Sequence, residues 1–444
     1  MKVNPELQRN LWLELTPLRL IGMPAVLVAT FILIALLAPD SRRETLVIFS
    51  LVLYGALVFL WGTRQASESV IIEVRDRTWD GQRMSSIGPW SMTWGKLFGS
   101  AVYPWYGGLL CLLSYAFLTG GDPQVRTTAV LALFLSCGLL AHATALLSSM
   151  QAMIKERRYN RSQTAAFLML GVMFIWPFLG AGLSKTNDLE WMGMNFRGLD
   201  FSLMTVLLFL FWTVLGIYRL MRTELQIKNG PLVWIAFACF LALYFAGFQN
   251  AADSGHRVFD RFVTGYFVAV LTMYLMAVGE RKDPVAFRRL IAAYDRGDRM
   301  ALLQDLPCWS LTLVPVLVAA CGTILTSGMG GSVLQQSPGL PLFIVASVLF
   351  LARDIGLLLF LNLAQSQKRS DMLFLLALVL LYGVVPGILS AAGLDRTTVL
   401  FWPRWDISSW ISLGAAGGEA VIIAVLVRRR WQGRYAVPQR PLDV

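Results

Sequence analysis

Long apolar segments recur along almost the whole chain of 444 residues. A helix that crosses a bilayer needs about 20 mostly apolar residues, and backbone polar groups in lipid must be paired within the helix. Only 15% of the residues are charged, against about 25% in soluble proteins, which argues against a soluble enzyme. We therefore predict an all-α, polytopic membrane protein with about 12 transmembrane helices. The apolar segments are residues 18–38, 45–65, 97–118, 127–150, 164–184, 199–219, 231–249, 259–279, 308–326, 341–363, 371–392 and 408–427.

Basic residues are distributed unevenly among the segments that connect these predicted spans. If the N-terminus is cytoplasmic, 28 of the 38 Lys and Arg residues fall on the cytoplasmic side, nine fall outside, and Arg353 lies within a span. Cytoplasmic loops are enriched in Lys and Arg, so we predict that both termini are cytoplasmic. The same rule explains the net charge of +11 without a nucleic-acid partner. The expected location is a cell membrane, the inner membrane in a bacterium.

Short landmarks recur in the same order in the two halves of the chain. Residues 73–76 read Glu-Val-Arg-Asp after the second span, and residues 280–283 read Glu-Arg-Lys-Asp after the eighth. We predict two six-helix halves, at 1–222 and 229–444, that form parallel repeats. Chance similarity between short basic loops is the alternative.

The N-terminal segment has the features of an amphipathic helix. Asn4 is a good N-cap residue and Pro5 suits the first helical position. We predict a helix that lies on the membrane surface, with Trp12 as an interface anchor, and that ends before Pro17. The apolar side is formed by Leu7, Leu11, Leu15 and Leu18, and the polar side by Glu6, Arg9, Asn10 and Glu14.

The segment 68–96 is too polar to cross a membrane, and we predict that it is a cytoplasmic loop. Its landmarks, in order, are Glu73, Arg75, Asp76, the Thr78-Trp79-Asp80 run, the Gly88-Pro89-Trp90 run and the Gly95-Lys96 pair. A solvated loop that satisfies the positive-inside rule is the simplest interpretation of this composition.

Together with the N-terminal helix, this order of landmarks resembles the permease subunits of ABC-2-type transporters. The usual pattern there is a Glu-Arg pair, Gly-Thr, a short helix, a Ser-Pro turn and Gly-Lys. The resemblance covers residues 1–220 and is faint over 229–444. Arg77 stands where the family usually has Gly. The resemblance implies that residues 80–86 form a coupling helix, which docks on a separate ATPase subunit.

The resemblance also implies which side chains form the coupling interface. The basic segment 280–307 is a second candidate element, with a site for anionic lipid headgroups as the alternative. The candidate coupling residues are Glu73, Arg75, Asp76, Asp80, Gln82, Arg83, Arg288 and Arg289.

The chain itself has no recognisable ATP site. Residues 88–97 contain two glycines and a lysine, but their spacing and their Trp and Pro residues do not fit a phosphate-binding loop. We therefore expect no catalytic residue, metal or cofactor in this chain, with ATP and Mg²⁺ bound by the partner ATPase. The five cysteines lack metal-ligand spacing and are expected to be small core residues.

Three charged side chains, those of Arg353, Asp354 and Glu419, and the histidine His142 fall well inside the predicted spans. Charges in lipid are costly and usually face a cavity or a partner. Arg353 and Asp354 are adjacent on a helix, so we expect them to have separate partners, with Glu419 as the candidate for Arg353. A fixed ion pair and a contact with substrate are both open for these residues. His142 is expected to be a hydrogen-bonded core histidine rather than a ligand.

These observations favour the permease subunit of an ATP-driven ABC exporter. It would move a hydrophobic or amphipathic substrate by alternating access, with two ATPase copies, membrane lipids and accessory export proteins as partners. Three alternatives remain: a secondary carrier like those of the major facilitator class, a membrane enzyme that acts on lipid-linked substrates, and an assembly or sensor subunit that transports nothing.

Overall fold

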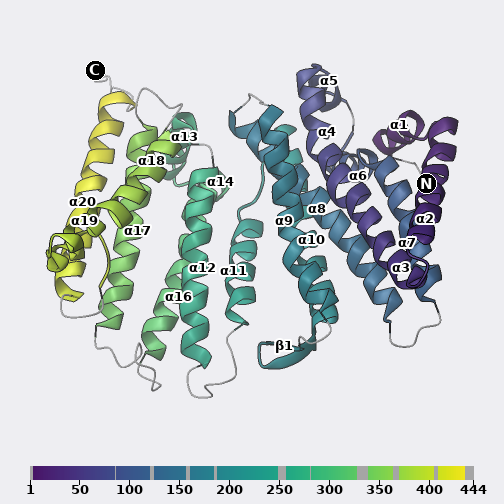
Figure 1. Ribbon diagram of the computed structural model, residues 1–444. Helices are drawn as coiled ribbons and strands as arrows, with labels where there is room; N and C mark the ends of the chain where they lie inside the picture. Colours follow the sequence, from purple (N-terminus) through teal and green to yellow (C-terminus); the bar gives the residue numbers. More distant parts are fainter. Residues whose placement is uncertain are drawn as a thin grey trace. The chain divides into compact units, whose positions relative to one another are not determined.

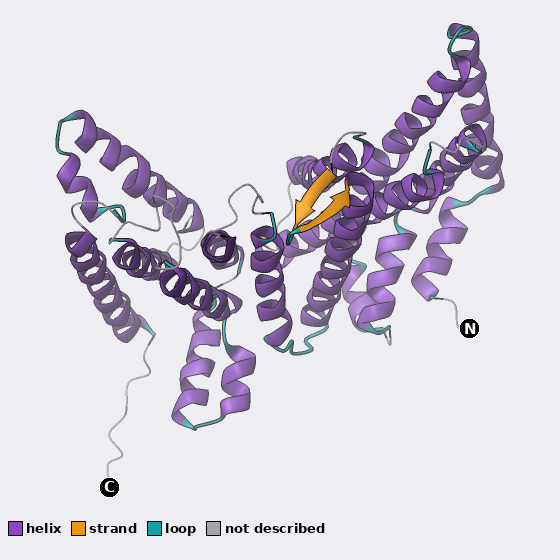
Figure 2. Ribbon diagram, turned by 90° about the horizontal axis from the view of Figure 1, so that it is seen from below, coloured by secondary structure: helices purple, strands orange, loops and turns teal. Residues whose placement is uncertain are grey.

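The computed structural model describes residues 4–85, 87–120, 125–156, 161–184, 188–248, 257–280, 282–327, 339–363, 370–404 and 409–435. The described chain is helical apart from one two-stranded hairpin, β1 (Asp188–Trp191) and β2 (Met194–Arg197), drawn in orange in Figure 2. It divides into two compact units: Met1–Leu189 with Asn195–Asn229, and Glu190–Met194 with Gly230–Val444.

The helices of the first unit surround a core between α4, α5, α6, α8 and α10, to which Val70, Trp79, Met92, Leu146 and Ile217 contribute (Figure 1). The elements are α1 (Pro5–Glu14), α2 (Pro17–Leu37), α3 (Arg42–Tyr54), the π-helix η1 (Gly55–Gly62), α4 (Thr63–Arg75), α5 (Trp79–Arg83), α6 (Pro89–Gly99), α7 (Val102–Thr119), α8 (Thr127–Glu156), α9 (Arg161–Leu183) and α10 (Gly198–Glu224).

The second unit packs its core between α12, α16 and α17, where Tyr266, Met273, Val316, Ile344 and Leu351 are buried. Its elements are α11 (Leu232–Ala246), α12 (Arg257–Gly279), α13 (Pro284–Asp295), α14 (Arg299–Asp305), α15 (Cys308–Leu311), α16 (Leu313–Thr326), α17 (Leu340–Asn362), α18 (Ser370–Val379), η3 (Leu380–Val384), α19 (Val385–Ala391), η4 (Asp395–Leu400) and α20 (Ser409–Arg434).

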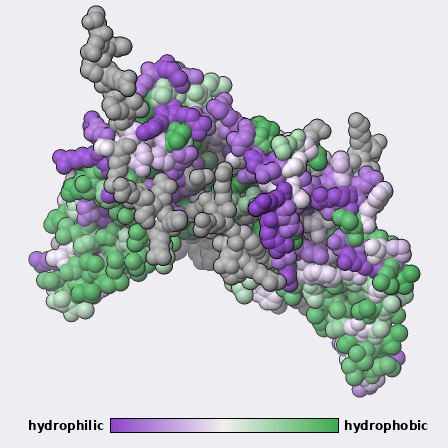
Figure 3. Space-filling view, turned by 90° about the horizontal axis from the view of Figure 1, so that it is seen from above, coloured by the Kyte–Doolittle hydropathy of each residue, from purple (hydrophilic) through white to green (hydrophobic). Residues whose placement is uncertain are grey.

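The prediction of an all-α polytopic membrane protein is confirmed. Among the described residues, 11 helices are long and apolar enough to cross a membrane. The seventh predicted span, 231–249, differs: α11 has 15 residues and is about 22 Å long, shorter than a hydrocarbon core of about 30 Å. Many large apolar side chains are exposed on the helix flanks, as lipid-facing surfaces require, and hydrophilic residues cover much of the helix ends in Figure 3.

The prediction that residues 68–96 form a loop is wrong for most of that segment. The second span continues without a break from Arg42 to Arg75, over 34 residues or about 51 Å. The C-terminal part of this helix, α4, is polar in composition but amphipathic, and it buries Ala66, Val70 and Ile71. Tertiary packing therefore maintains this helix beyond the apolar segment. The helices α5 and α6 together account for most of the rest of the predicted loop.

Candidate functional site

Four charged side chains from three helices of the first unit form a buried cluster. Lys96 on α6 lies between Glu6 of α1, whose Oε1 is 2.5 Å from Nζ, and Glu73 of α4, to which the same ammonium donates a hydrogen bond. Arg9 on α1 lies at the rim, with Nη2 3.0 Å from Oε1 of Glu73. We call Glu6, Arg9, Glu73 and Lys96 the α1–α4–α6 cluster; it contains two cations and two carboxylates.

Two glycines on α6 allow α1 to approach closely enough for this pairing. A Cβ atom added to Gly95 would lie 2.7 Å from Cβ of Glu6, and one added to Gly99 would lie 2.5 Å from Nδ2 of Asn10. Asn4 accepts a hydrogen bond from the amide of Glu6 and donates one of 2.6 Å to the carbonyl of Ser91. The interval between the two glycines is one helical turn, so they lie on the same face of α6.

The predicted N-terminal helix is confirmed as α1, which begins at Pro5 and ends before Pro17. Its polar side does not simply face water, because Glu6 is buried against α6. Trp12 is 78% exposed and is therefore available to the membrane interface.

A tight turn joins α4 to α5. The amide of Thr78 donates to the carbonyl of Glu73 at 2.9 Å, and that of Arg77 donates to the carbonyl of Val74 at 3.3 Å, which is the pattern of a Schellman motif. Arg77 has φ = 59°, in the left-handed region that favours glycine. This geometry gives a physical reason for a glycine at the equivalent position of the pattern that the chain resembles.

The short helix α5 is attached to two longer helices through its inner side. Gln82 donates to Oε1 of Glu73 at 2.7 Å, and the indole of Trp79 donates to Oε2 of Glu224 at 3.3 Å. Arg83 donates to the carbonyl of Glu224 at 3.0 Å. Glu224 is the last residue of α10, so the inner side of α5 connects α4 to α10.

The candidate coupling residues of the first unit therefore separate into two groups. Glu73, Gln82 and Arg83 point toward the protein and hold α5 in place. Arg75, Asp76 and Asp80 are exposed at the turn and on the outer side of α5, with Asp80 77% exposed and Arg75 3.2 Å from Asp76. Sequence reasoning did not select Glu6, Lys96, Trp79 or Glu224 as site residues, although the Gly95-Lys96 pair and the Thr78-Trp79-Asp80 run were noted as landmarks.

The other two candidates, Arg288 and Arg289, lie on α13 of the second unit, and both are exposed. Nε of Arg288 donates to the carbonyl of Tyr435 at 2.8 Å, beyond the C-terminal end of α20. The two arginines thus belong to the second unit, whereas the α1–α4–α6 cluster lies within the first.

The charged residues of the spans form a second buried group, in the second unit. The predicted pair is confirmed: Nη1 of Arg353 is 2.7 Å from Oε2 of Glu419 on α20. The expectation of separate partners is wrong, because Nε of Arg353 also donates to Oδ1 of Asp354 at 2.8 Å. The arginine side chain is long enough to curl back onto the neighbouring carboxylate, which short side chains at adjacent positions cannot do.

Two tyrosines complete this group and were not predicted. The hydroxyls of Tyr274 on α12 and Tyr382 in η3 donate to Oδ2 of Asp354, at 2.6 and 2.7 Å. We call Tyr274, Arg353, Asp354, Tyr382 and Glu419 the α17 network. Arg353 and Asp354 are buried, whereas the Glu419 side chain is 31% exposed. Tyr382 also lines a cavity of about 480 Å³ together with Trp402 and Arg404.

His142 is fully buried on α8. Its Nε2 lies 2.9 Å from the carbonyl of Val58 in the π-helix η1, and its ring packs edge-on against Trp105. Gly62 leaves room for the imidazole, because an added Cβ would lie 2.5 Å from Nε2. This environment agrees with a histidine that joins α8 to the long second span.

Comparison with family models, curated proteins and solved structures gives no match for this chain.

Proposed function

We propose that the chain is the transmembrane permease subunit of an ATP-driven exporter of the ABC-2 type. The observation that supports this most is that the separate landmarks of the resemblance come together at the α1–α4–α6 cluster. Asn4, Glu73 and Gly95-Lys96 lie up to 92 positions apart in the sequence, yet all contribute to one buried contact. The proposed ATPase partner binds ATP and Mg²⁺, and two copies serve one transporter.

The coupling element in this proposal is α5 with the turn before it. The long helix Arg42–Arg75 exceeds the hydrocarbon core by about 20 Å, and Figure 1 shows α5 at its end. The exposed Arg75, Asp76 and Asp80 then contact the ATPase. Force on α5 reaches α4 through Gln82 and reaches α10 through Trp79 and Arg83, and the cluster carries it to α6 and α1.

The membrane part of the proposed cycle is alternating access for a hydrophobic or amphipathic substrate. Few charges occur in the spans, which favours an apolar cargo. The α17 network joins α12, α17, η3 and α20, so it is suited to hold these helices in register while other parts move. Substrate contact at the adjacent cavity lined by Tyr382 is a finer part of the proposal.

A pull-down of the tagged chain from its native cells in mild detergent tests the proposal. We expect an ATPase to co-purify, at two copies per complex by native mass spectrometry. The pair Arg75→Ala and Asp80→Ala should weaken ATPase binding about tenfold, which corresponds to 1.4 kcal/mol. The matched control pair is Arg42→Ala and Glu44→Ala, two exposed charges at the opposite end of the same helix.

Each result of this experiment has a clear meaning. Equal ATPase binding by both variant pairs would remove α5 as the docking element. A folded chain without any ATPase would overturn the permease proposal and favour a secondary carrier or a membrane enzyme.

A further inference from the structure

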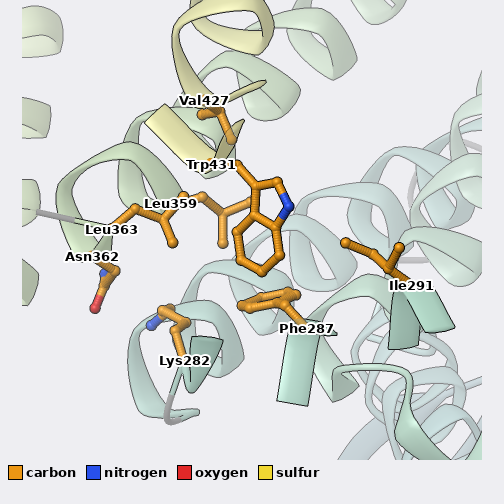
Figure 4. Close-up of a pocket in the computed structure, with 8 residues that line it drawn as sticks. All are labelled: Lys282, Phe287, Ile291, Leu359, Asn362, Leu363, Val427 and Trp431. Carbon is orange, nitrogen blue, oxygen red and sulfur yellow. The ribbon is translucent and has the colours of Figure 1, made fainter. Parts of the chain in front are cut away.

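A small apolar cavity lies in the second unit, where several helices end. It has a volume of about 180 Å³ and is lined by Lys282, Phe287 and Ile291 on the α13 side, Leu359, Asn362 and Leu363 from the end of α17, and Val427 and Trp431 of α20. Figure 4 shows the indole of Trp431 next to the Phe287 ring, with Lys282 and Asn362 at one side. Apart from Lys282 and Asn362, the lining side chains are apolar.

The cavity lies beside the ends of the apolar helices α17 and α20. α12 ends at Gly279 and α17 at Asn362, and the apolar part of α20 gives way to three consecutive arginines at residues 428–430. The rings of Phe287 and Trp431 pack edge to face at 6.3 Å, and aromatic residues of this kind are enriched at membrane interfaces. The site is therefore within reach of lipid headgroups and of the first part of the acyl chains.

The cavity lies against one side of the helix α13. Phe287 and Ile291, one turn apart, face the cavity, and Ile291 is 44% exposed, so the cavity reaches the surface. Arg288 and Arg289 lie between them in sequence and are exposed. With about 100° of rotation per residue, Arg288 flanks the cavity side of α13, whereas Arg289 lies on the opposite side. Arg288 uses Nε for the carbonyl of Tyr435, and a guanidinium carries four further N–H donors.

Basic residues occur in or beside the lining of this cavity. Lys282 lines it, and the exposed Arg428 follows the lining residue Val427 on α20. The neighbouring carboxylates are already engaged: Asp283 accepts from the amide of Val285, and Asp371 lies 3.7 Å from Nζ of Lys282. A ligand that fits an apolar cavity with a basic rim has an anionic head and a hydrocarbon tail.

We propose that this cavity binds part of an acyl chain of an anionic phospholipid, whose phosphate is held by Arg288. Arg288 reaches the end of α20, where Tyr435 stacks on the lining residue Trp431. Juxtamembrane arginines attract anionic lipids, and the cavity adds an apolar contact for the chain. The lipid then links α13 to the ends of α17 and α20. This inference does not depend on the proposed transport function, and it gives Arg288 a role other than ATPase docking.

Native mass spectrometry of the full chain in mild detergent tests the proposal, with phosphatidylglycerol and phosphatidylcholine of identical acyl chains as the probes. We expect about tenfold tighter binding of phosphatidylglycerol, the effect of about 1.4 kcal/mol. The variant Arg288→Ala should lose this preference. The matched control Arg289→Ala removes the neighbouring exposed arginine on the opposite side of α13 and should retain it.

A third variant tests the cavity itself. Ile291→Trp fills the opening from a partly exposed position, and it should weaken binding of both lipids while the protein remains folded. Three outcomes would overturn the proposal: an equal loss in both arginine variants, which indicates diffuse electrostatic attraction; no effect of Ile291→Trp; or loss of an ATPase from Arg288→Ala with the lipid preference unchanged.

Discussion

The α1–α4–α6 cluster and the α17 network both bury charge, but they balance it differently. The cluster has two cations, Arg9 and Lys96, for its two carboxylates. The network has one cation, Arg353, for the carboxylates of Asp354 and Glu419. Neutral tyrosine hydroxyls supply the remaining donors to Asp354.

This difference separates a balanced contact from one with an excess negative charge. In the cluster, every charged group has a partner of opposite sign on another helix. Removal of one partner therefore leaves a charge uncompensated next to a charge of the same sign. In the network, Glu419 is the carboxylate that adds to an already paired Arg353–Asp354 couple, and it is partly exposed. We therefore expect removal of a charge from the cluster to destabilise the folded protein more than removal of the charge of Glu419.

The substitution that breaks the cluster most strongly is Lys96→Met. It leaves Glu6 and Glu73 close together in a buried site, and breaking a buried pair costs about 3–5 kcal/mol. Thermal unfolding of the detergent-solubilised protein should show a clear fall in midpoint. Arg42→Met, which removes an exposed cation of the same unit, is the control and should leave the midpoint unchanged.

The cluster also depends on the close approach of α1, which Gly95→Ala tests. The added Cβ meets the packed stem of Glu6 at 2.7 Å, and overpacking of this kind costs about 1–3 kcal/mol. Gly88→Ala is the matched control, because nothing lies within 4 Å of its added Cβ. Equal unfolding midpoints for the two variants would show that α1 does not pack on α6 in the membrane.

The charge imbalance of the network predicts a milder response to Glu419→Gln. The amide can still accept a hydrogen bond from Arg353, and the excess negative charge disappears, so we expect a change below about 1 kcal/mol in unfolding free energy. Arg353→Met leaves two carboxylates without their cation and should cost several times more. Similar losses for the two variants would contradict the distinction drawn between the cluster and the network.

A third carboxylate, that of Glu280, is partly buried, and its contribution to stability depends on pH. Glu280 follows α12 and accepts hydrogen bonds from the amides of Cys308 at 3.1 Å and Trp309 at 3.2 Å, and Nζ of Lys282 donates to its backbone carbonyl at 3.0 Å. Burial raises the pKa of this carboxyl above its usual value of 4.5, although the two amides and Lys282 oppose the shift. Because the folded pKa is the higher one, this site stabilises the protein below pH 4.5 and loses that contribution as pH rises through the folded pKa.

Unfolding midpoints of Glu280→Gln and the unsubstituted protein should therefore converge at low pH. As the pH rises above 4.5, the unsubstituted protein should lose stability relative to the variant, by a fraction of a kcal/mol. A difference that does not change with pH would show that Glu280 keeps an ordinary pKa.

Much of the fold follows from apolarity, and the departures have physical reasons. Apolar segments predict the long spans because lipid excludes polar side chains. They do not predict α4, since Thr63–Arg75 is polar and its helix depends on packing of Ala66, Val70 and Ile71. The repeat of two six-helix halves stays a prediction, as does the cytoplasmic location of the termini.

Only part of the candidate site could be predicted from the sequence, for a related reason. The Arg353–Glu419 pair was predictable because charges in spans are few, so each has few partners to choose from. In the polar segment, many charges compete, and only the fold shows that Lys96 is the partner of Glu6 and Glu73. Tyr274 and Tyr382 gave no signal in the sequence, since tyrosines are common in apolar helices.

The turn residue Arg77 bears on how α5 is held in place. A second left-handed residue, Gln226 with φ = 60°, follows the end of α10, the other helix that α5 contacts. An Arg or Gln residue in the left-handed region is strained relative to Gly, so each turn persists because the surrounding hydrogen bonds hold it. The position of α5 therefore depends on the hydrogen bonds at the ends of α4 and α10, and not on a backbone that favours that region.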